Sequence, residues 1–319
     1  MPGFWTRILT LVAGRHAADP LLDVAVERAV DRVQPHLKTL RAYPRRYRDT
    51  VLGILTRVGK LSAEVPGPVT LDAGHYIRDP FVHALFGSPE DIARLYATPA
   101  IFAYMTQHDG GDLYALLSMR REEKPVFGLE LDGAVLRRDV AQRVIHFTDL
   151  QLIGPAPTEQ EARDNLRWYL FDRYMDHVAE GLERLRSERQ RLDVEKDLAL
   201  ARLRAVSTYR RPVRQRELDT VLACLGEVTA TLDLEHLDEV FDVVLSHPED
   251  CLSLAVRHLN LDAMGIVHAD DGSVEAVDLE FVDLIERDRE TRTVVLVHCP
   301  AVTPVSPGKM IEDAMQRLG

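Results

Sequence analysis

Hydrophobic positions in the first hundred residues recur at helical spacing. Asp19 and Pro20 are typical of a helix start, because the carboxylate can accept an exposed amide proton and proline's fixed φ suits the first helical turn. The positions that follow on one face are Leu22, Val26, Ala29, Val33 and Leu37. A second amphipathic helix is expected from Pro44 to the break at Pro66, and shorter helical pieces between 80 and 108.

From Asp112 onward the hydrophobic period changes from helical spacing to alternation. Short runs of apolar and β-branched residues at 113–119, 126–131 and 144–153 predict an antiparallel meander. A helix is expected over 234–245, and alternation then returns at 252–261, 274–281 and 293–298, with a hairpin turn signal at 270–272. The two stretches predict two small β-meander modules with flanking helices.

The strongest pattern lies between the two stretches. Thr158 and Glu161 have the spacing of a capping box. Steps of three and four then mark a seam at Trp168, Phe171, Met175, Val178, Leu182, Leu185, Arg189, Leu192, Lys196, Ala199, Leu203 and Val206. A helix of about 48 residues would be roughly 72 Å long, so it must project from a compact domain or have a partner helix.

That partner helix follows in the sequence. After the turn around Pro212, the same spacing recurs at Leu218, Val221, Leu225, Val228 and Leu232, which predicts an antiparallel coiled-coil hairpin. Two charged residues, Arg189 and Lys196, interrupt the seam. We favour long stems that cross the seam with their charges in water, and the alternative is register markers for a second chain.

These patterns predict an α+β protein with two small antiparallel β-meander modules and a projecting antiparallel coiled-coil hairpin. We place an N-terminal module of a helical pair and a meander at 1–157, the hairpin at 158–232, and an acidic C-terminal helix and meander at 233–319. The length of 319 residues fits two domains, or one with a large excursion.

Charge is segregated along the chain. The formal net charge is -12, and residues 227–290 alone carry eighteen acids against three arginines. The turn of the predicted hairpin is basic, because the stretch 202–216 contains six arginines and no acidic residue. Its candidate binding residues are Arg202, Arg204, Tyr209, Arg210, Arg211, Arg214 and Arg216. Guanidinium groups bind carboxylates and phosphates well, so these seven residues are the candidate interaction site. The plainer interpretation is a solvated loop whose arginines keep it soluble.

The sequence contains few signs of catalysis. Three cysteines form no close pair, and we find no phosphate loop, dinucleotide fingerprint, nucleophile elbow or HExxH helix, so we assign no catalytic residue, metal or cofactor. Asp278 and Glu280 share one strand face and could hold a cation, although a wet face is the favoured interpretation. Neighbouring His298 and Cys299 should point to opposite faces of a strand.

The hypothesis that fits these features is a non-enzymatic cytoplasmic scaffold or adaptor that associates through the hairpin. We expect a protein partner or a homodimer, and we rank an anionic membrane surface and then nucleic acid below them, since the acidic chain repels a phosphate backbone. One alternative is an enzyme, perhaps metal-dependent, with its site on the acidic module or between the modules. The other is a binder of anionic lipid or nucleic acid that uses the arginine-rich turn. The opening segment 4–14 is expected to form a helix docked on the core, and the alternative is a helix that lies flat on a membrane or on a partner.

Overall fold

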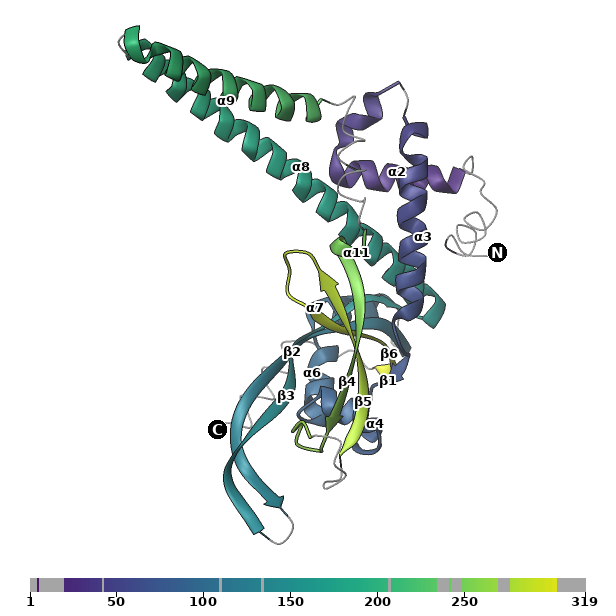
Figure 1. Cartoon of the computed structure of the whole chain (residues 1–319). Coiled ribbons are helices and arrows are strands. Elements are labelled where there is room, and N and C mark those ends of the chain that lie inside the picture. Colours follow the sequence, from purple (N-terminus) through teal and green to yellow (C-terminus); the bar gives the residue numbers. More distant parts are fainter. Residues whose placement is uncertain are drawn as a thin grey trace, which may run out of the picture. The chain divides into compact units, whose positions relative to one another are not determined.

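The protein combines long helices with an antiparallel β-sheet (Figure 1), which confirms the predicted α+β class. The computed structural model describes residues 5, 20–41, 43–108, 111–132, 135–205, 208–233, 241, 248–268 and 276–302. The expected N-terminal helix apart from Trp5, the expected helix over 234–245 apart from Phe241, and the expected turn at 270–272 lie outside these residues.

The chain divides into two compact units, and each is built from two separate stretches of sequence. The first unit comprises Met1–Gly59 with Leu170–Cys251, and the second comprises Lys60–Tyr169 with Leu252–Gly319. Two helices, α3 (Arg48–Glu64) and α8 (Glu159–Ala205), contribute residues to both units.

The first unit is helical. Besides parts of α3 and α8 it contains α2 (Pro20–Val33), two 3-10 turns (Pro35–Thr39 and Arg45–Tyr47), α9 (Arg211–Thr231) and the short α11 (Pro248–Cys251). The apolar face predicted for the first helix is buried, with Leu22, Val26, Ala29 and Leu37 at most 1% exposed. Phe171, Tyr174, Met175 and Val178 of α8 are fully buried as well.

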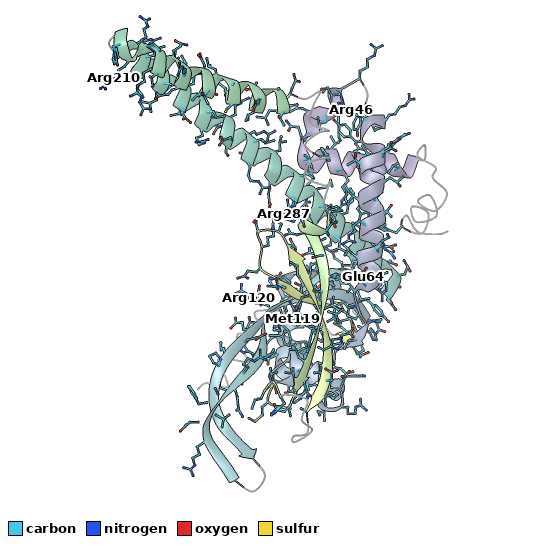
Figure 2. The ribbon with its side chains drawn as sticks, viewed as in Figure 1. Arg46, Glu64, Met119, Arg120, Arg210 and Arg287 are labelled. Carbon is cyan, nitrogen blue, oxygen red and sulfur yellow. The ribbon has the colours of Figure 1, made fainter. Side chains whose placement is uncertain are left out.

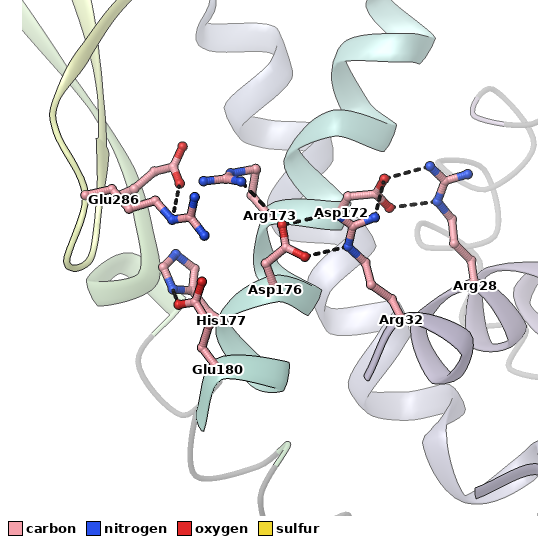
Figure 3. Close-up of polar contacts among 9 residues, drawn as sticks. Arg28, Arg32, Asp172, Arg173, Asp176, His177, Glu180 and Glu286 are labelled. Atoms are coloured by element: carbon pink, nitrogen blue, oxygen red, sulfur yellow. Dashed lines mark hydrogen bonds and ion pairs between the residues drawn. The ribbon is translucent and has the colours of Figure 1, made fainter. Parts of the chain in front are cut away.

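Ion pairs join α2 to α8 within this unit (Figure 3). Arg28 donates two hydrogen bonds to the carboxylate of Asp172, at 2.7 and 2.8 Å. Arg32 donates likewise to Asp176, at 2.6 and 3.1 Å. The two arginines are four residues apart on α2 and the two aspartates are four apart on α8, so the second ion pair lies one helical turn beyond the first. Planar guanidinium groups fit carboxylates in this bidentate geometry, which fixes the orientation of the two helices at their contact.

The predicted helical hairpin is present. The 47 residues of α8 span about 70 Å, and Thr158 accepts a hydrogen bond from the Glu161 amide at 3.3 Å, which is the threonine's part of the predicted capping box. After a 3-10 turn at Thr208–Arg210, α9 returns from the tip beside α8 (Figure 1).

Burial in the hairpin follows the predicted seam. Along α8 Leu182, Leu192 and Ala199 are buried, and along α9 Leu218 and Val221 are buried. The half-buried seam positions are Leu185, Leu203, Leu225, Val228 and Leu232. The ammonium group of Lys196 donates a hydrogen bond to Asp193 at 2.8 Å, and this bond raises the lysine pKa. The Lys196 ammonium group is therefore paired outside the apolar seam, which agrees with the favoured interpretation that its aliphatic stem crosses the seam.

The second unit contains one sheet where two meanders were expected. Its strands are β1 (Val69–Thr70), β2 (Gly111–Asp132), β3 (Val135–Ala156), β4 (Leu252–Leu261), β5 (Val277–Glu286) and β6 (Arg292–Val302). The order is β3-β2-β6-β5-β4, with β1 parallel to β6. β6 joins the early strands to the late ones, because it pairs with β2 on one side and β5 on the other.

The strands β2 and β3 have 22 residues each and form one long ribbon, so the first two predicted strands are a single strand. The pairing of β2 with β6 ends at Met119, and β2 continues beyond it with β3 (Figure 2). Pro125 lies in the continuing part, opposite Arg143. The Arg143 carbonyl accepts a hydrogen bond from Val267 on the far side of β3. In an antiparallel ladder the backbone groups of two opposite residues either point toward each other or both point away. Since the Arg143 carbonyl points away from β2, the nitrogen of its partner Pro125 points away from β3.

A short segment after β4 links the two ends of the sheet. The chain turns at Asp262 so that Leu261 pairs with Val267, while Ile266 pairs with Val144 of β3. The Ile145 amide donates to the Gly265 carbonyl at 2.8 Å. The backbones approach so closely that a Cβ on Gly265 would come within 2.6 Å of the Ile145 carbonyl oxygen.

Four short helices cover the sheet. They are α4 (Ala73–Arg78), α5 (Pro80–Leu85), α6 (Pro89–Tyr96) and α7 (Pro99–Gln107). Val82, Leu85, Ile92 and Ile101 of these helices share a core with sheet residues that include Leu117, Ile145, Phe147, Phe281 and Val297. The core holds α5 and α6 against β3, and the cavity described below lies there.

Candidate functional site

The predicted interaction site lies at the tip of the hairpin. Here we define the tip as Arg202, Arg204, Tyr209, Arg210, Arg211, Arg214 and Arg216, which are supplied by the end of α8, the connecting turn and the start of α9. Figure 2 labels Arg210 at this end of the hairpin. The turn brings the two groups of arginines together because α9 begins within six residues of the end of α8.

Most of the tip arginines have no acidic partner among the residues that the structure describes. Arg214 donates two hydrogen bonds to Glu217, at 2.6 and 2.8 Å. In the part of the chain that the structure describes, no carboxylate pairs with the other five arginines, which are all exposed or half-exposed. The ring of Tyr209 is 92% exposed among them. The tip therefore presents uncompensated positive charge beside an exposed aromatic ring.

The charges of the tip also run against the dipole of α9. The N-terminal end of a helix carries partial positive charge and is stabilised by acidic side chains. The first turn of α9 has no acid and contains Arg211 and Arg214. Repulsion within the tip is therefore relieved when an anionic group approaches it.

The acidic strand face considered as a cation site is open to solvent. The side chains of Asp278 and Glu280 are 67% and 57% exposed, and Leu279 between them is buried. His258 lies 3.9 Å from the Asp278 carboxylate and 4.0 Å from that of Glu280. This alternation matches the favoured interpretation of a wet strand face.

His298 and Cys299 point to opposite sides of β6, as expected. Cys299 is fully buried, and burial raises the pKa of its thiol to about 12. The His298 ring stacks on Tyr114 with centroids 4.5 Å apart, and its Nε2 lies 3.2 Å from a carboxylate oxygen of Asp112. A thiol with this pKa carries almost no thiolate at neutral pH, so Cys299 is a core residue and no nucleophile.

A buried carboxylate on β5 was missed by the sequence reasoning. Asp283 is 2% exposed, accepts hydrogen bonds from Arg121 at 3.0 Å and Thr293 at 2.8 Å, and lies 3.7 Å from Arg257. These residues come from β2, β4, β5 and β6, so the group ties four strands together. The carboxylate is fully compensated and has a structural role.

The second missed feature is a cavity of about 700 Å³ in the sheet unit. Its walls are the α5–α6 region, residues Val144–Phe147 and Leu150 of β3, and the turn Ala263–Gly265. The ionisable groups of the lining are Tyr76, His83, Asp91, Arg94 and His146. No sequence signal could have found this cavity, because its walls come from three stretches far apart in sequence; His83 and Ala263, which meet there, are 180 residues apart.

Among the described residues, no three His, Cys, Asp or Glu side chains gather as a metal-binding group. None of the described helices combines the length and apolar character that crossing a bilayer requires. Comparison with protein-family models, with curated proteins and with solved structures gave no match.

Proposed function

We propose that this chain is a cytosolic scaffold or adaptor that binds an acidic protein surface through the tip of its α8–α9 hairpin. The observation that carries the proposal is the tip itself, where five arginines without an acidic partner in the described chain lie on the same turn of the hairpin as a tyrosine that is 92% exposed. Arginine and tyrosine are the side chains that most often anchor protein interfaces.

A second copy of the chain is the simplest source of an acidic surface. Residues 227–290 carry a net charge of -15, while the tip carries six arginines. Opposite charges of this size steer association and hold the two surfaces in register. The hairpin supports such a contact because apolar side chains of its seam are buried along α8 and α9, and the arginines of the tip lie beyond them.

Removing the charge of the tip tests the proposal. We would change Arg210, Arg211, Arg214 and Arg216 to Ser and measure mass by light scattering and binding to fluorescent poly-L-glutamate. Both measurements would be made at about 50 mM and about 300 mM salt, because exposed charge pairs weaken as salt rises. The wild type should form a salt-sensitive dimer or bind poly-L-glutamate, and the variant should lose at least about tenfold in affinity.

A matched control removes the same number of charges elsewhere on the hairpin. Arg184, Arg186, Arg189 and Arg191 lie on α8 outside the tip, and their change to Ser should leave association within about twofold of the wild type. Equal losses in the two variants would show that general charge, not the tip, drives association. A wild-type monomer that ignores poly-L-glutamate but binds phosphatidylserine vesicles or DNA would also overturn the proposal.

A further inference from the structure

The cavity in the sheet unit contains the edge of a β-strand. Four consecutive residues of β3, Val144–Phe147, contribute to its lining. A strand face can present only alternate residues, because neighbouring side chains point to opposite sides of the sheet. Four residues in a row therefore line the cavity with the backbone edge of β3 rather than with one of its faces.

Part of this edge is already used by the chain itself. The Ile145 amide donates to the Gly265 carbonyl at 2.8 Å, and the Val267 amide donates to the Arg143 carbonyl at 2.9 Å. The segment 265–267 thus adds to β3 as a short extra strand. These bonds prove that the outer edge of β3 accepts an antiparallel strand at 143–145.

The next outward-facing residue of the edge is open. Arg143 and Ile145 direct their backbone groups outward, so Phe147, two residues further, does the same. No described residue forms a hydrogen bond with the Phe147 amide or carbonyl on that side. Beyond it, Asp149 has a φ of 48°, which interrupts the regular strand. The open edge is therefore short and lies within the cavity.

The rest of the cavity offers contacts for side chains. Leu85, Phe86 and Leu95 form an apolar wall opposite β3, and Met264 is 73% exposed at the rim. His83 holds the rim in place, since its Nε2 lies 3.1 Å from the Ala263 carbonyl oxygen. Apolar walls beside an open strand edge are the arrangement used by proteins that bind extended peptides.

The charges of the lining favour an acidic ligand. Its carboxylate, Asp91, already accepts hydrogen bonds from Ser88 at 3.0 Å and Arg94 at 2.6 Å. The Arg94 side chain is 67% exposed, and a guanidinium has five donors. The two imidazoles of the lining are already engaged, since His146 Nε2 lies 3.3 Å from Glu122 and His83 lies 3.3 Å from the Tyr76 carbonyl and 3.1 Å from the Ala263 carbonyl. Arg94 is therefore the lining residue with donors to spare.

We propose that this cavity binds an extended peptide bearing a carboxylate side chain, which adds a strand to β3 at Phe147 and places its carboxylate near Arg94. The backbone of β3 supplies affinity, and the apolar wall and Arg94 supply specificity. This site is separate from the tip of the hairpin, and neither proposal depends on the other.

Peptide pools test this directly. The probe is a fluorescent pool of acetylated and amidated hexapeptides with Val, Ile or Thr at alternate positions and Glu or Asp at one of the others. Two further pools carry Lys instead of the acid, or N-methyl groups along one backbone edge. We expect the acidic pool to bind at micromolar to submillimolar concentration and both other pools to bind at least about tenfold more weakly. Amide exchange at Phe147 should slow when the acidic pool binds.

Variants of the protein separate the site from other surfaces. Ala84→Trp should fill the cavity and weaken binding at least about tenfold, and Arg94→Gln should abolish the preference for the acidic pool. Ala141→Trp adds the same side chain on an exposed position of the ribbon and should change nothing. Thermal melting by circular dichroism confirms that each variant folds, and the Phe147 exchange in the wild type needs no variant.

Three results would overturn the proposal. They are no binding of the acidic pool at about 1 mM, equal binding of the N-methylated pool, and unchanged Phe147 exchange in the presence of bound peptide.

Discussion

At the scale of single residues, Asp262 organises the turn that joins the ends of the sheet. Its Oδ1 accepts hydrogen bonds from the amides of Met264 at 2.8 Å and Ile266 at 2.9 Å, and its Oδ2 lies 2.9 Å from His268 Nε2. Burial raises the pKa of this carboxyl, but the hydrogen bonds outweigh burial and the pKa is lowered overall. The charged form of Asp262 is therefore the form that stabilises the fold.

Replacing this carboxylate gives a prediction with a defined pH dependence. Asp262→Asn should lower the free energy of unfolding by about 1 to 2 kcal/mol at pH 7, because charge-assisted hydrogen bonds become neutral or are lost. Since the folded pKa lies below the unfolded value of about 3.9, the wild type keeps this stabilisation above that pH and loses it as the pH falls through the folded pKa. Urea denaturation followed by circular dichroism should show the two proteins converging below about pH 4. A difference that stays constant well below that pH would contradict this role.

At the scale of elements, the hairpin depends on a narrow apolar seam. Leu218 is 5% exposed, whereas Leu222, one turn further along α9, is 45% exposed. The two leucines have the same helix propensity, so they differ only in what they bury. They form a matched pair for measuring how strongly α9 is held.

Truncating the two leucines should have unequal effects. Leu218→Ala removes buried contacts and should lower the local stability of α9 by about 2 kcal/mol or more, while Leu222→Ala should lower it by less than about 1 kcal/mol. Hydrogen exchange measured by mass spectrometry reports this directly, since 2 kcal/mol corresponds to roughly 30-fold faster exchange. Similar exchange rates in α9 of the two variants would show that the seam does not hold this helix.

The elements divide into those that sequence patterns predict and those that they do not. The capping box at Thr158 and the seam of α8 and α9 follow from local spacing, so they were predicted residue by residue. The joining of the two expected meanders into one sheet was not predicted, because the pairing of β6 with β2 depends on contacts between residues far apart in sequence. The peptide cavity shares this origin, whereas the arginine-rich tip was visible as a run of like charges.

At the scale of the whole molecule, the three cysteines report on the packing of both units. Cys224 on α9 is exposed, and Cys251 and Cys299 are fully buried. Burial also raises the pKa of Cys299 to about 12, which removes its reactive thiolate at ordinary pH. Thiol reactivity should therefore distinguish the surface of the hairpin from the interior of each unit.

A thiol reagent at pH 8 should modify one cysteine per chain in the native protein and three in denaturant. Cys224→Ser should abolish the rapid reaction and leave the slow ones unchanged. The readout is the absorbance of released nitrothiobenzoate, with the modified residue identified by peptide mapping. Rapid labelling of Cys299 in the native protein would contradict its place in the core.

The ribbon of β2 and β3 has one more consequence for the protein in a crowded solution. A long strand with an unpaired side is a template for uncontrolled growth, since each new chain can dock by the same row of donors and acceptors. Pro125 interrupts that row on β2, because its nitrogen, which has no hydrogen, faces the side where no described strand pairs with this part of β2. The missing donor leaves the hydrogen bonds with β3 intact and removes one from any chain that docks on the other side of β2, which disfavours edge-to-edge growth of the ribbon.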